Sequence, residues 1–316
     1  MKTLKTRAYP WSLSLTLLAP FAVIVAGVGC SPVSTEVKVR PEEIRPAKEA
    51  ARAELISAYN QLSRSITSIN ASVELVPTAG SAYSGVIQQY HEVNAFILAA
   101  KPAMIRVIGQ APVLAKNVFD MTSDGRTFHV YIPSKNKFIV GPAALERSTE
   151  KPIENLRPQH ILDAIFWPEI SDNPANTVVI FEEANEPAGR YYVLTVLTSA
   201  FQEETERKIW FDRADLSLCR VQIYGAGGRL LSDVHMDAWR TAAPSGITPG
   251  SAAQPQFPWH IVLNRPHDDY QLDIRVKKIT LNEEISLDRF KLDQPSGTEL
   301  VQLGNTGPGS QPPNQK

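Results

Sequence analysis

The sequence predicts a mainly β protein of the α+β class, built on a large curved antiparallel sheet or barrel. Three observations support this fold class. Many short segments alternate between apolar and polar residues, sequences typical of tight turns separate them, and only two segments space their apolar residues as a helix does. Consecutive strands joined by tight turns form a meander, which curves into a barrel-like sheet.

Residues 1–29 have the pattern of an export signal. Three basic side chains lie within the first seven residues, and no charged side chain follows until after Thr35. The apolar run ends in Gly27-Val28-Gly29-Cys30, which resembles the lipobox where bacterial lipoproteins are cleaved and lipidated on the cysteine. We therefore expect Cys30 to be the lipidated N-terminus. An uncleaved transmembrane helix is the alternative, since about 20 apolar residues can span a bilayer.

The remaining chain divides into a tether, one domain and a tail. Residues 30–48 combine Ser and Pro with a charged stretch, a composition typical of a solvated linker. Residues 49–303 carry the apolar patterns and form the expected domain. Residues 304–316 consist mostly of Gly, Pro, Gln and Asn, which predicts a disordered tail.

An amphipathic helix is expected directly after the tether. Its apolar residues recur at spacings of four and three and are Leu55, Tyr59, Leu62, Ile66 and Ile69. Polar and charged residues lie between them. From Ala71 onward the apolar period changes from 3.6 to 2, so we expect the apolar side of this helix to pack on a sheet.

The strands follow the helix. Residues 270–277 alternate strictly, as does an antiparallel strand with one face toward solvent. Less regular runs of the same kind are 71–76, 86–98, 104–108, 118–121, 128–132, 137–140, 177–181, 191–197, 208–211, 218–224, 230–239 and 260–263. Turn sequences such as Ser123-Asp124-Gly125 and Gly225-Ala226-Gly227-Gly228 separate them.

Two segments interrupt this meander. Residues 157–167 place Pro158 near a first helical turn and carry apolar residues at helical spacing, which predicts a short helix. Residues 241–258 are rich in Pro, Gly, Ala and Ser and predict a flexible loop inserted between two strands.

Charge and cysteine content exclude several classes of protein. The chain has 32 basic and 33 acidic side chains, so its net charge of −1 provides no field to attract nucleic acid. Cys30 and Cys219 are the only two cysteines, too few for a disulfide scaffold or a cysteine-rich zinc module. With Cys30 lipidated, Cys219 is best interpreted as a small buried apolar residue.

No pattern in the sequence assembles an active site. Motifs of zinc proteases, serine hydrolases, nucleotide-binding loops and dithiol redox proteins are absent. His267-Asp268-Asp269 is the one crowded group of metal-ligand types, and we interpret it as a solvated turn. We therefore expect no enzyme activity, no catalytic or metal-binding residue and no cofactor.

The apolar sides of the strands are the remaining candidate site. They could surround the helices as an ordinary core or line a cavity for an acyl chain. Periodicity alone favours the packed core, because every β protein has apolar strand faces. The candidate cavity residues are Tyr192, Leu194, Val196, Trp210, Ile223, Val234, Met236, Leu272, Ile274 and Val276.

The order of these segments resembles the LolA/LolB superfamily of lipoprotein carriers. The resemblance rests on the N-terminal helix, the strand 86–98, the segment 101–107, the loop 109–114 and the segment 119–125. It continues more weakly through residues 131–133, the helix at 160–167 and the strands from 208 to about 292. It implies a half-open antiparallel β-barrel, or strongly curved sheet, whose concave face is covered by the two helices and holds acyl chains of lipoproteins.

The resemblance also implies a contact residue. LolB is an outer-membrane lipoprotein that presents an exposed leucine on a loop between two early strands. By position Leu114, or its neighbour Val113, resembles that residue, although ordinary packing of the loop against a strand edge is equally compatible with the sequence. This chain is longer than a typical LolB, and its segment 241–258 has no obvious counterpart there.

Together these expectations describe a lipid-anchored protein of the bacterial cell envelope, at the outer membrane and facing the periplasm. It would bind acyl chains of lipids or lipoproteins in an apolar cavity and take part in their transfer or insertion. Its expected partners are an acyl lipid or lipoprotein, the membrane and a periplasmic carrier protein. The alternative is a non-enzymatic interaction or sensor module that uses the same fold, with a filled core, to bind polypeptide.

Overall fold

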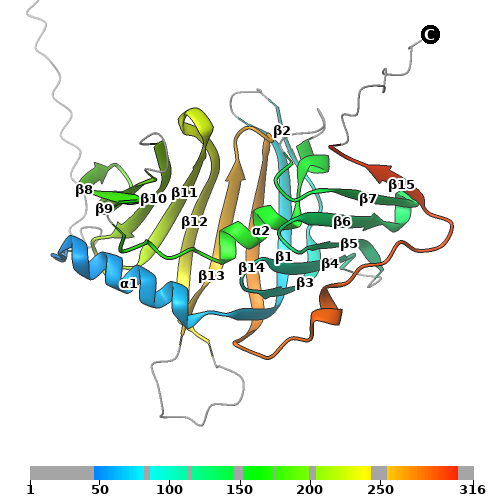
Figure 1. The fold of residues 1–316 in the computed structure, drawn as a ribbon, viewed down its shortest axis with the longest axis horizontal. Coiled ribbons are helices and arrows are strands. Elements are labelled where there is room, and N and C mark those ends of the chain that lie inside the picture. Colours follow the sequence, from blue (N-terminus) through cyan, green and yellow to red (C-terminus); the bar gives the residue numbers. More distant parts are fainter. Residues whose placement is uncertain are drawn as a thin grey trace, which may run out of the picture. The chain divides into compact units, whose positions relative to one another are not determined.

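One continuous sheet of 15 strands dominates the computed structural model (Figure 1). The structure describes residues 46–81, 86–112, 116–145, 152–173, 175–198, 204–242 and 255–304. Cys30, Val113 and Leu114 lie outside the described residues, as do nearly all of the predicted tether and tail.

The strand order places the N-terminal strand in the middle of the sheet. It runs β15-β7-β6-β5-β4-β3-β1-β14-β13-β12-β11-β10-β9-β8, and β2 also pairs with β1. The strands are β1 (Ser68–Ser81), β2 (Val86–Gln89), β3 (Val93–Ala100), β4 (Met104–Gln110), β5 (Asn117–Ser123), β6 (Thr127–Ile132), β7 (Lys137–Pro142), β8 (Thr177–Glu186), β9 (Gly189–Thr198), β10 (Glu204–Asp212), β11 (Leu218–Gly225), β12 (Arg229–Thr241), β13 (Gln256–Arg265), β14 (Tyr270–Leu281) and β15 (Glu299–Gln302).

Two meanders, β3 to β7 and β8 to β14, meet at β1, which pairs with both β3 and β14. Neighbouring strands in the described part of the sheet are antiparallel, except that β15 pairs with β7 in parallel. The end strands β8 and β15 do not pair with each other in the described part of the chain, so the curved sheet stays open there. This confirms the predicted mainly β, half-open architecture.

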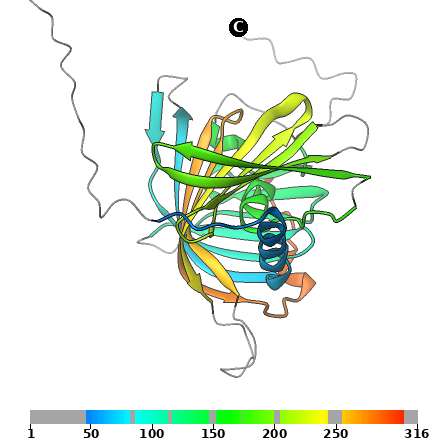
Figure 2. The ribbon, with the colours of Figure 1, turned by 90° about the vertical axis from the view of Figure 1, so that its left-hand side faces the viewer.

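Two helices cover one side of the sheet, and Figure 2 shows the sheet curving around α1. They are α1 (Arg52–Ser65) and α2 (Pro158–Ile165). We call the side that they cover the inner face and the opposite side the outer face. Among the described residues neither helix has the length and apolar character needed to cross a membrane.

The helix α1 is shorter than its apolar spacing predicts. It ends at Ser65, Ile66 is already extended with φ −119° and ψ 112°, and Ile69 pairs with Leu281 in the sheet. Both isoleucines are still buried, with exposed fractions of 2% and 1%. A β-branched residue packs as well on a sheet as on a helix, so a helical spacing can continue into a strand.

The predicted flexible insertion is wrong at both ends. Thr241 pairs with Gln256 and Trp239 with Pro258, so β12 and β13 extend into the segment 241–258. Phe257 is 2% exposed, and its burial favours strand pairing despite the neighbouring proline. Residues 243–254 lie outside the described residues.

Three further details differ from or confirm the sequence predictions. The single strand expected over 86–98 is two strands, because residues 90–92 interrupt the pairing with β1. The strand β15 was not predicted. The glycine-rich turn after β11 does lead into β12, and Gly227 and Gly228 both have φ +70°, a conformation that glycine adopts without strain.

Candidate functional site

The inner face of β8 to β14 carries a continuous apolar row. Residues directly opposite each other on neighbouring strands point to the same face of a sheet. The register therefore aligns one inner-face residue from each strand, and in order these are Phe181, Leu194, Ile209, Val221, Val234, Leu263 and Leu272. From Leu194 onward every side chain in this row is at most 2% exposed.

Nine of the ten predicted cavity residues share this face. Leu194, Val234 and Leu272 belong to the row itself. Six others lie on the same face of these strands by alternation, and they are Tyr192, Val196, Ile223, Met236, Ile274 and Val276. The structure thus brings together side chains from four strands that are far apart in the sequence.

Trp210 does not belong to this group. It lies opposite Val193 and Arg220 on the outer face, where its indole Nε1 donates to Gln222 Oε1 at 3.1 Å. Its neighbours Ile209 and Phe211 point inward instead and are 0% and 2% exposed. Because three consecutive residues are apolar here, the sequence does not indicate which of them point inward. This explains why Trp210 was assigned to the wrong face.

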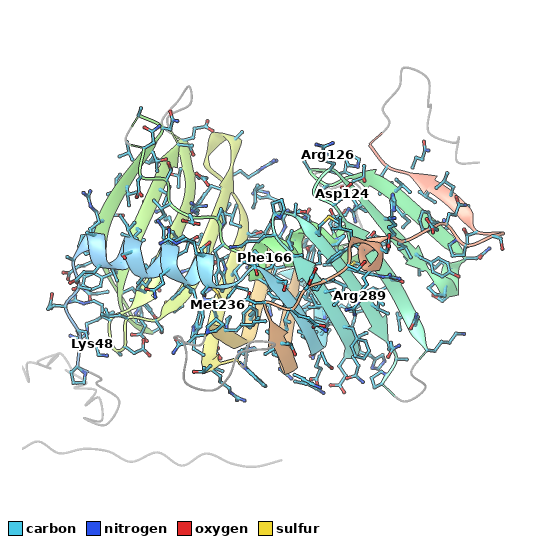
Figure 3. All side chains as sticks on the ribbon, turned by 60° about the horizontal axis from the view of Figure 1, so that its bottom comes forward. Lys48, Asp124, Arg126, Phe166, Met236 and Arg289 are labelled. Atoms are coloured by element: carbon cyan, nitrogen blue, oxygen red, sulfur yellow. The ribbon has the colours of Figure 1, made fainter. Side chains whose placement is uncertain are left out.

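The two helices fill the curve of the sheet with apolar side chains. On α1 the main buried apolar residues are Leu55 and Tyr59, and on α2 they are Ile161, Leu162 and Ile165. All of them belong to the same apolar core as the sheet residues, as do Phe166 and Met236, which Figure 3 labels. In the described state the inner face is therefore a packed core, closed by α1 and α2.

A set of polar contacts ties α1 to the chain that follows α2, and we call it the α1 clasp. Asn60 donates to the Ile170 carbonyl at 3.0 Å and accepts from the Ile170 N–H at 2.8 Å. Ser63 donates to the Trp167 carbonyl. The exposed Arg64 forms an ion pair with Glu169 at 2.6 Å. The clasp comprises α1 residues Asn60, Ser63 and Arg64 and the segment 167–170.

A buried polar cluster lies where α2 meets the start of β14. His160 Nδ1 is 2.6 Å from the Tyr270 hydroxyl. Burial lowers the pKa of His160 well below its usual value, and the charges of Arg265 and Arg157 lower it further. Burial also raises the pKa of Tyr270. The imidazole is therefore neutral near pH 7.

The turn 267–269 is not simply solvated, which corrects the interpretation made from the sequence. Asp268 is 4% exposed, and its carboxylate accepts from Arg265 Nε at 2.7 Å. Within the part of the chain that the structure describes, no three His, Cys, Asp or Glu side chains are arranged to hold a metal ion. Burial raises the pKa of the Cys219 thiol to about 12, so this thiol is protonated at neutral pH.

This chain is similar to several solved structures. They include a DUF1329 family protein from Desulfovibrio piger, with 13% identity, a TM-score of 0.48 and coverage of 75% of this chain and 94% of that chain. A LolA superfamily protein from Nitrosomonas europaea has 11% identity, a TM-score of 0.45 and coverage of 77% and 99%.

A third is a domain from Vibrio parahaemolyticus described as an outer membrane lipoprotein-sorting protein, with 10% identity, a TM-score of 0.42 and coverage of 74% and 94%. No protein-family model matches the sequence, and no curated protein matches it.

Proposed function

We propose that the protein binds acyl chains of lipids or lipoproteins on its inner face and takes part in their transfer or insertion at the bacterial outer membrane. One observation carries this proposal. An apolar row crosses the inner faces of seven strands, and the cover over it includes one helix of 14 residues and one of 8. No covalent step is involved.

The exchange of cover and ligand explains how a filled core can bind. An acyl chain that replaces part of the helical cover is stabilised by about 0.8 kcal/mol for each buried methylene group. The α1 clasp opposes this exchange with three hydrogen bonds, each contributing about 1 kcal/mol, and one exposed ion pair that contributes less. A bilayer is the apolar environment that receives the chain on release.

Two residue assignments complete the proposal. Lipidated Cys30 anchors the protein to the membrane, and Val113 and Leu114 contact the bilayer or an incoming donor. These residues lie outside the described part, but the ends of their loop support the second assignment. The Ala111 N–H donates to the Lys116 carbonyl at 2.9 Å, which closes a hairpin loop, and both Pro112 and Lys116 are exposed.

The test uses two leucines of the same strand that face opposite sides of the sheet. Leu194 lies opposite Phe181, which packs against the core, whereas Leu197 lies opposite Val178, which is 41% exposed. We expect Leu194→Glu to reduce binding of a fluorescent palmitoyl probe and to lower stability by several kcal/mol, because an unpaired carboxylate is costly in an apolar site. Leu197→Glu, the matched control, should keep most of the parent protein's probe affinity and most of its stability.

A folded Leu194→Glu protein that binds the probe with the parent affinity would show that the inner face is not the acyl site. The comparison is made on full-chain protein, with thermal unfolding recorded on the same preparations. If Leu194→Glu fails to fold and the parent protein does not bind the probe, the inner face is instead an ordinary core without a ligand.

A second candidate function, binding of an extended polypeptide, is favoured by β8. This strand ends the sheet and pairs on one side only among the described strands. Its Val178 and Ile180 are 41% and 44% exposed, so it can accept a further strand. Ile180→Lys should then weaken polypeptide binding and leave binding of the palmitoyl probe unchanged.

A further inference from the structure

Two polar side chains are buried between α1 and β10. Tyr59, on α1, is 1% exposed, and Arg207, on β10, is 4% exposed. The Arg207 guanidinium carbon lies 5.9 Å from the centroid of the Tyr59 ring. Arg207 is opposite Val196 and Ile223 in the sheet register, which places it on the inner face.

The hydrogen bonding of these two side chains is incomplete. Arg207 Nη2 donates to the Glu169 carbonyl at 2.9 Å, and Nη1 forms an ion pair with Glu206 at 3.1 Å. Arg207 Nε and the Tyr59 hydroxyl are buried and have no hydrogen-bond partner among the described residues. Each buried polar group left in this state costs about 1–3 kcal/mol, so such groups in folded proteins are normally satisfied.

The charges around the two donors select the kind of acceptor that fits. Glu206 already balances the positive charge of Arg207, so a further anion would bring an uncompensated charge into a buried site. Burial raises the pKa of Tyr59 to about 12, so its hydroxyl remains a donor. An uncharged carbonyl oxygen can accept two hydrogen bonds and brings no charge.

We propose that Tyr59 and Arg207 bind the carbonyl oxygen of an ester or amide at the head of an acyl chain. This inference rests on the proposed function, because the methylene chain would lie on the apolar inner face beside them. Tyr59 belongs to the apolar core, and Arg207 lies opposite Val196 of that core. Because Tyr59 lies on α1, the pair would fix the position of the polar end of the ligand once α1 again covers the inner face.

The experiment compares two ligands that differ in the carbonyl group. Methyl palmitate and heptadecane have similar chains, but only the ester can accept hydrogen bonds. Full-chain protein is titrated with each, and methyl palmitate labelled with ¹³C at the carbonyl reports its hydrogen bonding through the carbonyl stretching frequency. Tyr59→Phe removes one donor, and Arg207→Lys keeps the charge but removes Nε. Tyr191→Phe, on the outer face, is the control.

We expect Tyr59→Phe and Arg207→Lys each to weaken ester binding about five-fold, the equivalent of one hydrogen bond, and to leave heptadecane binding unchanged. The carbonyl stretching frequency of bound ester should rise in both variants and stay at the parent value in Tyr191→Phe. Thermal unfolding shows that each variant is folded.

Equal affinity for ester and alkane in the parent, unchanged in both variants, would overturn the inference and mean that water alone satisfies the two donors. Tighter binding of palmitate than of its methyl ester would also overturn it, since the site would then prefer an anion. Failure of both neutral ligands to bind would overturn the proposed function as well, so the two failures are distinguishable.

Discussion

At the scale of single residues, His160 makes the free energy of unfolding depend on pH. Its folded-state pKa lies well below the value of about 6.5 that it has in an unfolded chain. As the pH falls through 6.5, the unfolded chain takes up a proton that the folded chain does not. The free energy of unfolding therefore decreases as the pH falls below about 6.5.

The variant His160→Gln tests this dependence, because glutamine can still hydrogen-bond with Tyr270 but does not titrate. Urea unfolding of parent and variant near pH 7.5 and near pH 5.5 gives two differences in the free energy of unfolding. We expect the parent to lose more stability than the variant on acidification. Equal losses would mean that other groups account for the pH dependence.

Individual residues also mark the limit of prediction from sequence. The alternation of residues 270–277 places Leu272 and Ile274 on the inner face, as found. The apolar run around Trp210 does not alternate, so its residues cannot be assigned to the inner or outer face from sequence. Arg207 was missed altogether, because an arginine is normally solvated and because an irregularity in the pairing of β10 with β9 precedes it.

At the scale of elements, the α1 clasp holds α1 against the segment 167–170, and we expect it to control access to the inner face. Asn60→Ala removes two hydrogen bonds to Ile170 and should destabilise the closed position of α1 by about 2 kcal/mol. Hydrogen exchange of the α1 amides should become faster, and the palmitoyl probe should bind sooner. Gln61→Ala, at the exposed neighbouring position, is the control.

If Asn60→Ala leaves both exchange and probe binding at the values of Gln61→Ala, α1 does not act as the cover that a ligand displaces. The two substitutions differ in burial but remove the same kind of side-chain amide. Their helix propensities change in the same direction, which isolates the contribution of the clasp.

The loop between β4 and β5 carries the proposed contact with the membrane. Leu114→Glu should change stability by no more than about 0.5 kcal/mol if the side chain is exposed, whereas delivery of acyl lipid to liposomes should fall. Thermal unfolding and delivery are measured on one preparation. A stable variant with full delivery would remove this role, and a variant destabilised by several kcal/mol would indicate that Leu114 is packed in the core.

Most elements follow from local patterns, and those that do not depend on distant partners. The two helices and the meander can be predicted from the sequence, because alternation, helical spacing and turn residues are patterns of neighbouring residues. The strand β15 is short and is defined by its pairing with β7, some 160 residues earlier in the chain. The ends of β12 and β13 are likewise fixed by their mutual pairing and by burial of Phe257.

At the scale of the whole molecule, the lipid anchor proposed at Cys30 would attach the domain to the membrane. Cys30→Ser should leave unprocessed precursor and abolish labelling with diacylglycerol, because the modification occurs on the thiol. Mobility on gels and lipid labelling measure the two effects. Unchanged processing would favour an ordinary signal peptide or an uncleaved anchor.

The filled inner face could not be distinguished from an empty cavity by sequence alone. Apolar strand faces look the same whether helices or a ligand cover them, and the outcome depends on how α1 and α2 pack from distant parts of the chain. The clasp between Asn60 and Ile170 spans 110 residues and has no sequence pattern of its own. The structure supplies this contact and, with it, the closed arrangement of α1 over the inner face.

We propose that the inner face exchanges part of its helical cover for an acyl chain. Mass spectrometry of lipids that co-purify with the full-chain protein after gentle extraction tests it most directly, with Leu194→Glu and Leu197→Glu extracted in parallel. We predict acyl lipid in a fixed ratio to the parent and to Leu197→Glu, and its loss from folded Leu194→Glu. A parent protein without lipid, or equal lipid on all three folded proteins, would contradict the claim.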